Sequence, residues 1–446
     1  MAVRRKRVGL ITLSLARERT DLAEAFGKNA FRALETAGLE VCGNEELVFE
    51  TGQCIAAARR LKEQDVDCLL LLLGTWVFAP TVVDTLRAVD LPFGIWAEDN
   101  PGSFSLTAGG MVHGSLDELG LRHRFFYGSP NSARLLEEIA AFIAAAACAR
   151  DLGGRRLAVV GGRVTGMYTT MADIIQVKSL FGVETEHIDA VRVHLTAESL
   201  AAKEVAGVSR DLFQRFGRVH TKGPALDKSI RLYLALKTIL KQEGYEIAAI
   251  KCMEEMINHY ACFCLAASLL NNEGFTVSCE ADINAALTMS ILRTVSGDIA
   301  MFGDVNHLDL ERDELRIANC GSMPTLMADA EKKVDLENQY EYMGEAGGAT
   351  TVFSVRSSPV TIARLFRLSG RYAMVAAEGT TVEFPRERFR EAREYWPHAL
   401  VKLDCDSRQL VQNFRSNHMH LGFGRHLAAL KEFCCLKGLE FIALMR

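Results

Sequence analysis

The apolar run CLLLLLGTWVFA, from Cys68 to Ala79, constrains the fold of this chain more than any other segment. It falls well short of the roughly 20 residues that a helix needs to cross a bilayer. It is apolar throughout rather than alternating, which is typical of a parallel strand buried on both faces. Because the amphipathic segment PTVVDTLRAVD follows it, the run predicts one strand-helix unit of an α/β domain.

The same alternation of strand and helix patterns continues on both sides of this run. RVGLITLSL precedes DLAEAFGKNAFRALETAG near the start, and the polar joint RDLGGRR is followed by a second series that begins with RLAVVGG. We therefore predict an α/β fold with two doubly wound parallel-sheet domains, over residues 1–152 and 153–345. Beyond them, segments such as RYAMVAAEGTTVEFP have no helix pattern between them, and they predict a smaller β-rich C-terminal domain over residues 346–446.

Composition and charge exclude several classes of protein. Of the 446 residues, 49% are apolar and 24% are charged, which is typical of a soluble globular chain. The net charge of −5 provides no basic field for nucleic acid. The basic start MAVRRKR is followed by a short apolar stretch that runs into RERTD without a small-residue cleavage site, so we do not expect a signal peptide. The 12 cysteines lack zinc-site spacing and indicate free thiols, so we expect a cytoplasmic protein without membrane or nucleic-acid partners.

Two acidic residues stand at the ends of successive apolar runs. FTVSCEAD reaches Glu280, and DIAMFGDV reaches Asp304. In a parallel sheet the carboxyl ends of the strands share one edge, and ligands bind in the crevice outside it, so we expect the two acids to face each other across a site. Helix capping is the alternative. It explains Asp282 better than Glu280, because Asp is a favoured N-cap residue.

A histidine near the C-terminus completes a set of candidate metal ligands. In RSNHMHLGFGRH, His418 occupies a predicted turn before a strand-like stretch, and His420 is a weaker candidate. Two carboxylates and one imidazole leave coordination positions open, and this set suits Mn²⁺ or a similar divalent ion better than a thiol-seeking metal. An exposed loop histidine without a role is the alternative interpretation of His418.

Around these residues the sequence resembles the L-fucose isomerase/L-arabinose isomerase family of ketol isomerases, especially its L-fucose isomerase branch. The matching segments are IKCMEEM, CEADINAALTMSILRTVSGDIAMFGDV, NCGSMPT and NHMHLGFGRHLAALKEFCCLKGLEFI. The resemblance implies that Glu280, Asp304 and His418 hold Mn²⁺ and that the two acids form the catalytic acid/base pair. It also implies a homo-oligomer, namely a hexamer, and a free monosaccharide substrate such as L-fucose or D-arabinose.

The implied reaction interconverts an aldose and a ketose by proton transfer through an enediol held on the metal. Arg17 and Trp76 each follow a strand of the first domain, and we expect both to contact sugar. The resemblance implies that this sugar lies in the site of a neighbouring subunit. Two other functions remain open. A pair of α/β domains also builds non-catalytic sugar-binding or sensor proteins, and nonhaem iron oxygenases use the same set of two carboxylates and one histidine.

Overall fold

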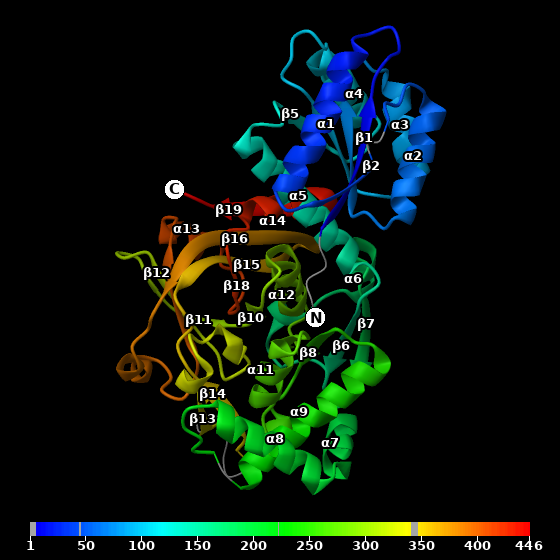
Figure 1. The fold of residues 1–446 in the computed structure, drawn as a ribbon. Coiled ribbons are helices and arrows are strands. Elements are labelled where there is room, and N and C mark those ends of the chain that lie inside the picture. The colour runs from blue at the N-terminus through cyan, green and yellow to red at the C-terminus, as the bar shows by residue number, and fades with distance from the viewer. Residues whose placement is uncertain (1–5, 44–45, 222, 340–346) are drawn as a thin grey trace. The chain divides into compact units, whose positions relative to one another are not determined.

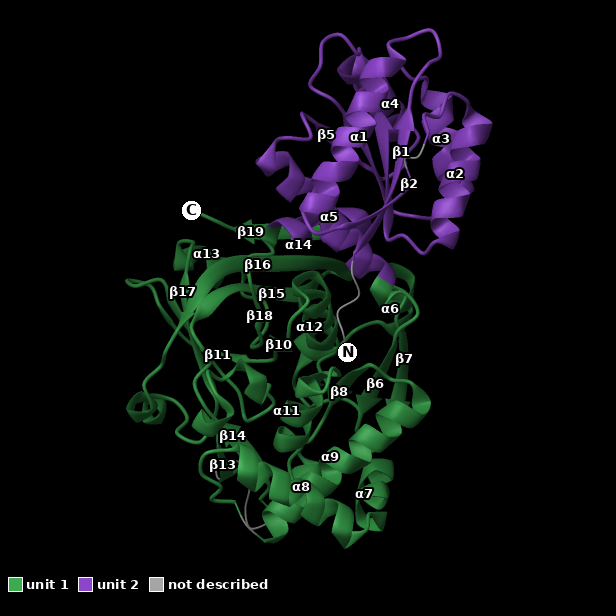
Figure 2. Ribbon diagram, in the orientation of Figure 1, with its two compact units in different colours: residues 1, 151–427, 439–446 green, residues 2–150, 428–438 purple. Residues whose placement is uncertain are grey.

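The computed structural model describes residues 6–43, 46–221, 223–339 and 347–446 (Figure 1). The chain divides into two compact units (Figure 2). Among the described residues, the N-terminal unit comprises those from 6 to 150 and from 428 to 438, and the large unit comprises those from 151 to 427 and from 439 to 446. The predicted domain boundary at residue 345 lies outside the described residues, and the division into three domains stays a prediction.

The N-terminal unit is built on a five-stranded sheet in the order β2-β1-β3-β4-β5, with every neighbouring pair parallel. Its strands are β1 Arg7–Leu13, β2 Glu40–Gly43, β3 Cys68–Leu73, β4 Phe93–Ala97 and β5 Arg124–Tyr127. Its helices are α1 Thr20–Thr36, α2 Thr51–Glu63, α3 Ala79–Ala88, α4 Ser105–Glu118 and most of α5 Ala133–Leu152, together with most of α14 Leu427–Lys437.

Strand β3 explains why the run from Cys68 is apolar at every position. Leu69 and Leu71 belong to a core shared with residues of α2, α3 and α4. Leu70 and Leu72 belong to a second core, shared with residues of α1 and α5. Because successive side chains of a strand point to opposite faces, a sheet covered on both faces needs an apolar residue at every step. The predicted parallel, doubly covered sheet is confirmed.

The large unit begins with a second parallel sheet, which has four strands in the order β7-β6-β8-β9. Its strands are β6 Arg156–Val160, β7 Glu184–Ile188, β8 Ile247–Ile250 and β9 Thr276–Cys279. Its helices are α6 Ile174–Phe181, α7 Ala190–Ser199, α8 Ala202–Arg215, α9 Pro224–Glu243, α10 Glu255–His259, α11 Cys264–Asn272 and α12 Ile283–Ser296. The second predicted α/β region is therefore also confirmed.

An eight-stranded sheet follows, in the order β10-β18-β15-β16-β17-β12-β11, with β19 beside β16. Its strands are β10 Ala300–Met301, β11 Asp304–Asp309, β12 Glu314–Ala318, β15 Ser358–Leu368, β16 Arg371–Val382, β17 His398–Leu403, β18 His420–Phe423 and β19 Glu440–Leu444. The pairings along this order are antiparallel, and only β19 runs parallel to its neighbour. A small antiparallel pair, β13 Asp335–Asn338 and β14 Ala349–Val352, and the short helix α13 Ser407–Asn413 complete the region. The predicted β-rich C-terminal region is confirmed.

The prediction that the run ending in Asp304 is the next strand of the parallel sheet is wrong. Strand β10 pairs antiparallel with β18, and β11, which starts at Asp304, pairs antiparallel with β12. Close packing accompanies this pairing, since a Cβ atom at Gly303 would lie 2.1 Å from Cγ2 of Ile317 in β12. The chain therefore leaves the parallel sheet after β9 and enters the antiparallel sheet at β10.

Helix α12 makes this transfer. It contacts β8 and β9 of the parallel sheet and β15 and β18 of the antiparallel sheet (Figure 1). Burial between two sheets explains why its sequence, INAALTMSILRTVS, is mostly apolar around the whole helix. None of the helices in the described part of the chain combines the length and apolar composition that a membrane crossing requires.

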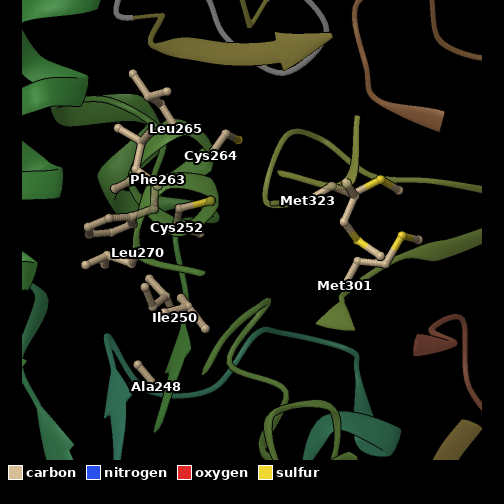
Figure 3. Close-up of a cluster of buried hydrophobic side chains, with 14 of the residues drawn as sticks. Ala248, Ile250, Cys252, Phe263, Cys264, Leu265, Leu270, Met301 and Met323 are labelled. Atoms are coloured by element: carbon tan, nitrogen blue, oxygen red, sulfur yellow. The ribbon is translucent and has the colours of Figure 1, made fainter. Parts of the chain in front are cut away.

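One hydrophobic core joins the parallel sheet and the eight-stranded sheet of the large unit. It includes Ile250 of β8, Met301 of β10 and Val375 of β16. Figure 3 shows part of it, with Ile250 and Cys264 on one side and Met301 and Met323 on the other. The junction between the sheets is therefore a packed region, able to hold polar side chains in fixed positions.

Candidate metal centre

A strained turn after β9 positions Glu280. Glu280 and the following Ala281 have φ values of 58° and 49°. This left-handed conformation costs L-residues roughly 1–2 kcal/mol each, and it is concentrated at functional sites. The Glu280 side chain is 13% exposed, and its Oε2 lies 2.9 Å from Nε2 of His418.

Backbone hydrogen bonds place Asp304 beside His418. The two residues form an isolated antiparallel bridge. The amide of Val305 donates to the Asn417 carbonyl at 2.9 Å, and the amide of Met419 donates to the Gly303 carbonyl at 3.0 Å. As a result, Nε2 of His418 lies 3.4 Å from Oδ1 of Asp304.

The structure thus brings the three predicted ligands together. Glu280, Asp304 and His418 each offer one ligand atom, and these atoms lie within 4.8 Å of one another. They do not meet at one edge of a parallel sheet, as the sequence suggested. Glu280 comes from the parallel sheet, whereas Asp304 and His418 come from the antiparallel sheet. His418 is fully buried rather than in an exposed loop.

Asp282, two residues after Glu280, holds the opposite side of the His418 ring. Its Oδ2 lies 2.7 Å from Nδ1 of His418, and its Oδ1 accepts a hydrogen bond from the amide of Ala285. Asp282 is therefore the N-cap of α12, as the sequence predicted, and it also fixes the imidazole. A carboxylate that accepts from Nδ1 leaves Nε2 directed at the two acids, the arrangement found around metal-binding histidines.

A buried arginine neutralises Asp282. Nη1 of Arg364, in the middle of β15, lies 2.7 Å from Oδ2 of Asp282, and its Nη2 lies 3.2 Å from Oδ1. The side chains of Arg364 and Asp282 are 1% and 0% exposed. Nη1 of Arg364 also lies 3.0 Å from Nε2 of His420, which accepts from it. His420 therefore supports Arg364 and does not join the three-ligand cluster.

Asn319 holds Asp304 from the other side. Its Nδ2 donates to Oδ2 of Asp304 at 3.1 Å. Its Oδ1 accepts from the amides of Gly321 and Ser322 and from the Ser322 hydroxyl, at 3.1, 2.7 and 2.6 Å. Because Asn319 is fully buried and hydrogen-bonded through both side-chain atoms, it orients the Asp304 carboxylate rigidly.

Electrostatics at the cluster favour a cation between the carboxylates. Burial raises the pKa of Glu280 to about 7, although the hydrogen bond from His418 opposes that rise. Burial alone would lower the pKa of His418, but its hydrogen bonds to Asp282, Asp304 and Glu280 outweigh burial and raise the pKa well above the usual value. Burial also opposes ionisation of Asp282, but Arg364 and His418 hold its pKa well below the usual range. Without an ion, the raised pKa values of Glu280 and His418 favour their protonated forms. A bound cation would supply positive charge in place of those protons.

Glu280 and Asp304 line a cavity of about 240 Å³. Five cysteines also line it, namely Cys252, Cys262, Cys264, Cys279 and Cys320. On another part of the lining, Nε1 of Trp396 donates to Oε1 of Gln339 at 3.1 Å. Among the described lining residues, Arg393 is the only lysine or arginine, and its guanidinium lies 5.3 Å from the ring centroid of Trp396.

The predicted sugar contacts Arg17 and Trp76 belong to the N-terminal unit. Arg17 is exposed in the turn after β1. Trp76 is half-buried, and its ring lies edge-on to that of Phe78, with 6.3 Å between the ring centroids. Neither is among the described residues that line the cavity. Their role as sugar contacts stays a prediction.

Sequence reasoning missed Arg364 and Asn319. The sequence did contain an indication for Arg364, because a charged residue in the apolar strand VTIARLFRL requires either an exposed face or a buried partner. The sequence contained no comparable indication for Asn319. Its side chain can orient Asp304 only because it also accepts hydrogen bonds from Gly321 and Ser322 in the loop that follows it.

The C-terminal part of the chain matches a known protein family. Residues 317–444 match the family described as L-fucose isomerase, C-terminal domain. The C-terminal part of the chain is thus similar to that domain, and the resemblance inferred from the sequence is confirmed.

Among individual proteins, the sulfoquinovose isomerase of Priestia megaterium is 22% identical over 81% of this chain and 82% of its own length. That of Alkalicoccus urumqiensis is 23% identical over 73% of this chain and 71% of its own length. The chain is therefore a distant homologue of sugar isomerases of the fucose isomerase-like family.

The solved structures that resemble this chain do so only weakly. A periplasmic solute-binding protein of Actinobacillus succinogenes with bound D-allose covers 66% of this chain and 92% of its own, at 10% identity and a TM-score of 0.18. At that score the similarity supports no conclusion about fold or function.

We predict that the buried ion pair of Arg364 and Asp282 contributes strongly to the stability of the protein. Asp282→Asn leaves Arg364 without its counter-charge, and we expect the free energy of unfolding of the metal-free protein to fall by about 3–5 kcal/mol. Urea denaturation measures this change. The control is Asp329→Asn, which breaks the exposed pair with Lys333 and should leave the free energy of unfolding nearly unchanged, because solvent screens that pair. Equal losses in the two variants would contradict the proposed importance of the buried pair.

Proposed function

We propose that the protein is a metal-dependent aldose–ketose isomerase that acts on a free monosaccharide. The observation that carries the proposal is the convergence of Glu280, Asp304 and His418, with both acids lining a cavity. The homology to sugar isomerases supports the same class. A non-catalytic sugar-binding protein needs no such ligand set, so the cluster favours the enzyme.

The donor set fits a divalent ion, and we propose Mn²⁺. Two carboxylate oxygens and one imidazole nitrogen suit Mn²⁺ and leave positions open for other ligands. Such an ion, when bound, polarises the substrate carbonyl and stabilises the negative charge that develops during proton transfer. Asp282 and Asn319 keep His418 and Asp304 in the orientation that binding requires.

Glu280 and Asp304 are the proposed acid/base pair. Isomerisation moves one proton between C1 and C2 and another between the two neighbouring hydroxyl oxygens. One carboxylate takes the proton from carbon and returns it, and the other exchanges the hydroxyl proton. Both side chains line the same cavity, so both can reach a sugar bound there.

Two kinds of sugar are candidate substrates. The sequence resemblance suggests L-fucose or D-arabinose. The relatives named sulfoquinovose isomerase suggest an aldose with a sulfonate group, and Arg393 offers the cavity a guanidinium for such an anion. A ketose assay with L-fucose, D-arabinose and sulfoquinovose distinguishes these candidates, and turnover of none of them would favour a binding protein.

The proposal extends to the cell and the assembly. We propose a cytoplasmic homo-oligomer, a hexamer as in the family that the sequence resembles. Arg17 and Trp76 would then contact sugar in the site of a neighbouring subunit.

Catalysis should depend on both the metal and Glu280. Chelator treatment should abolish turnover, and added Mn²⁺ should restore it. Glu280→Gln preserves the shape of the side chain but removes its charge, so kcat should fall by roughly 10²-fold or more. His418→Ala should mainly weaken metal affinity, and excess Mn²⁺ should partly rescue it.

Glu311→Gln is the matched control, because the Glu311 side chain is 88% exposed and that change should leave kcat unaltered. Full turnover by Glu280→Gln, or by enzyme shown to be metal-free, would refute the mechanism.

Mn²⁺ affinity should increase with pH. Glu280, with its pKa raised to about 7, and His418, with its pKa raised, must each lose a proton before they can bind an ion. The apparent Kd should therefore fall between about pH 6 and pH 8, by roughly tenfold per pH unit for each proton released. Titration calorimetry in buffers of different ionisation enthalpy counts those protons. Glu280→Gln should release fewer, and a Kd independent of pH would contradict the shared proton–metal site.

A further inference from the structure

The N-terminal unit contains a second cluster of metal-ligating side chains. His113 and Asp117 lie in α4, and His123 precedes β5. Each offers one ligand atom, and these atoms lie within 4.8 Å of one another. Nδ1 of His113 is 2.7 Å from Nε2 of His123, and Nε2 of His113 is 3.6 Å from Oδ2 of Asp117.

The backbone sets the tautomer of His123. Its Nδ1 lies 2.8 Å from the Leu121 carbonyl oxygen. A carbonyl oxygen only accepts, so Nδ1 carries the proton and Nε2 presents its lone pair to His113. Metal-binding histidines have this arrangement, with one nitrogen donating to a carbonyl and the other facing the ion.

Neighbouring aromatic rings hold both imidazoles in place. His123 stacks on Phe93, with 5.9 Å between ring centroids and 14° between planes. His113 packs against Phe125 at 5.4 Å. Asp117 is one helical turn beyond His113 and so lies on the same face of α4. The side chains of His113 and Asp117 are 43% and 64% exposed, so an ion can reach them from solvent.

We propose that His113, His123 and Asp117 bind a divalent ion such as Zn²⁺. Two imidazole nitrogens and one carboxylate oxygen suit Zn²⁺ and leave one position of a tetrahedral site for water. The ion would take the place of the hydrogen bond between the two rings. It would tie α4 to the segment before β5, and its role would be to stabilise the N-terminal unit. This proposal is independent of the proposed isomerase activity.

The test compares Zn²⁺ binding by the full-length protein and its variants, using equilibrium dialysis and metal analysis. His113→Gln and His123→Gln should each lose one bound Zn²⁺ relative to the unchanged protein, and Asp117→Asn should bind that ion at least tenfold more weakly. His187→Gln, at an exposed histidine of β7, is the control and should retain it. Circular dichroism in the presence of chelator checks that all variants fold.

Copper provides a spectroscopic readout that separates the two sites. Electron paramagnetic resonance of Cu²⁺ added to the His418→Ala protein should show coupling to two imidazole nitrogens, and His113→Gln should abolish that pattern. If folded His113→Gln and His123→Gln bind as many Zn²⁺ ions, as tightly, as the unchanged protein, the proposal is overturned. Neither result alters the test of Mn²⁺-dependent isomerisation.

Discussion

The buried ion pair between Arg364 and Asp282 holds the candidate metal centre together. Two charges withdrawn from water are costly unless they are paired and hydrogen-bonded, and here both carboxylate oxygens of Asp282 are used. Arg364 belongs to the antiparallel sheet, whereas Asp282 begins the helix that leaves the parallel sheet. The pair therefore links the two layers. We infer that the pair fixes the position of His418 in addition to contributing to stability.

The centre lies where two sheets of different type meet, and its chemistry follows from that position. Glu280 is held at the end of β9 in a strained turn, while Asp304 and His418 are joined to each other by backbone hydrogen bonds. Without an ion, the proton on His418 offsets part of the negative charge of the surrounding acids. A divalent ion bound between these side chains would take the place of protons and would connect the two sheets. Metal binding and local stability are therefore expected to be coupled.

Local pattern predicted much of this fold, but strand partners were harder to predict. The uniform apolar run at β3 requires a sheet covered on both faces, and the structure has one. The run before Asp304 gave no sign that it pairs with β18, a strand more than a hundred residues away in sequence. The three candidate ligands were identified from residue type and position, although the reasoning about one sheet edge was wrong. Arg364 lies 82 residues from Asp282, so only the folded chain reveals that pairing.

We propose that Glu280, Asp304 and His418 bind one divalent ion directly. Crystals grown with Mn²⁺ and measured at the manganese absorption edge test it without reference to any substrate. We expect one strong anomalous peak within bonding distance of a carboxylate oxygen of Glu280, a carboxylate oxygen of Asp304 and Nε2 of His418. A saturated crystal with no peak there, and with Nε2 of His418 still hydrogen-bonded to Glu280, would contradict it.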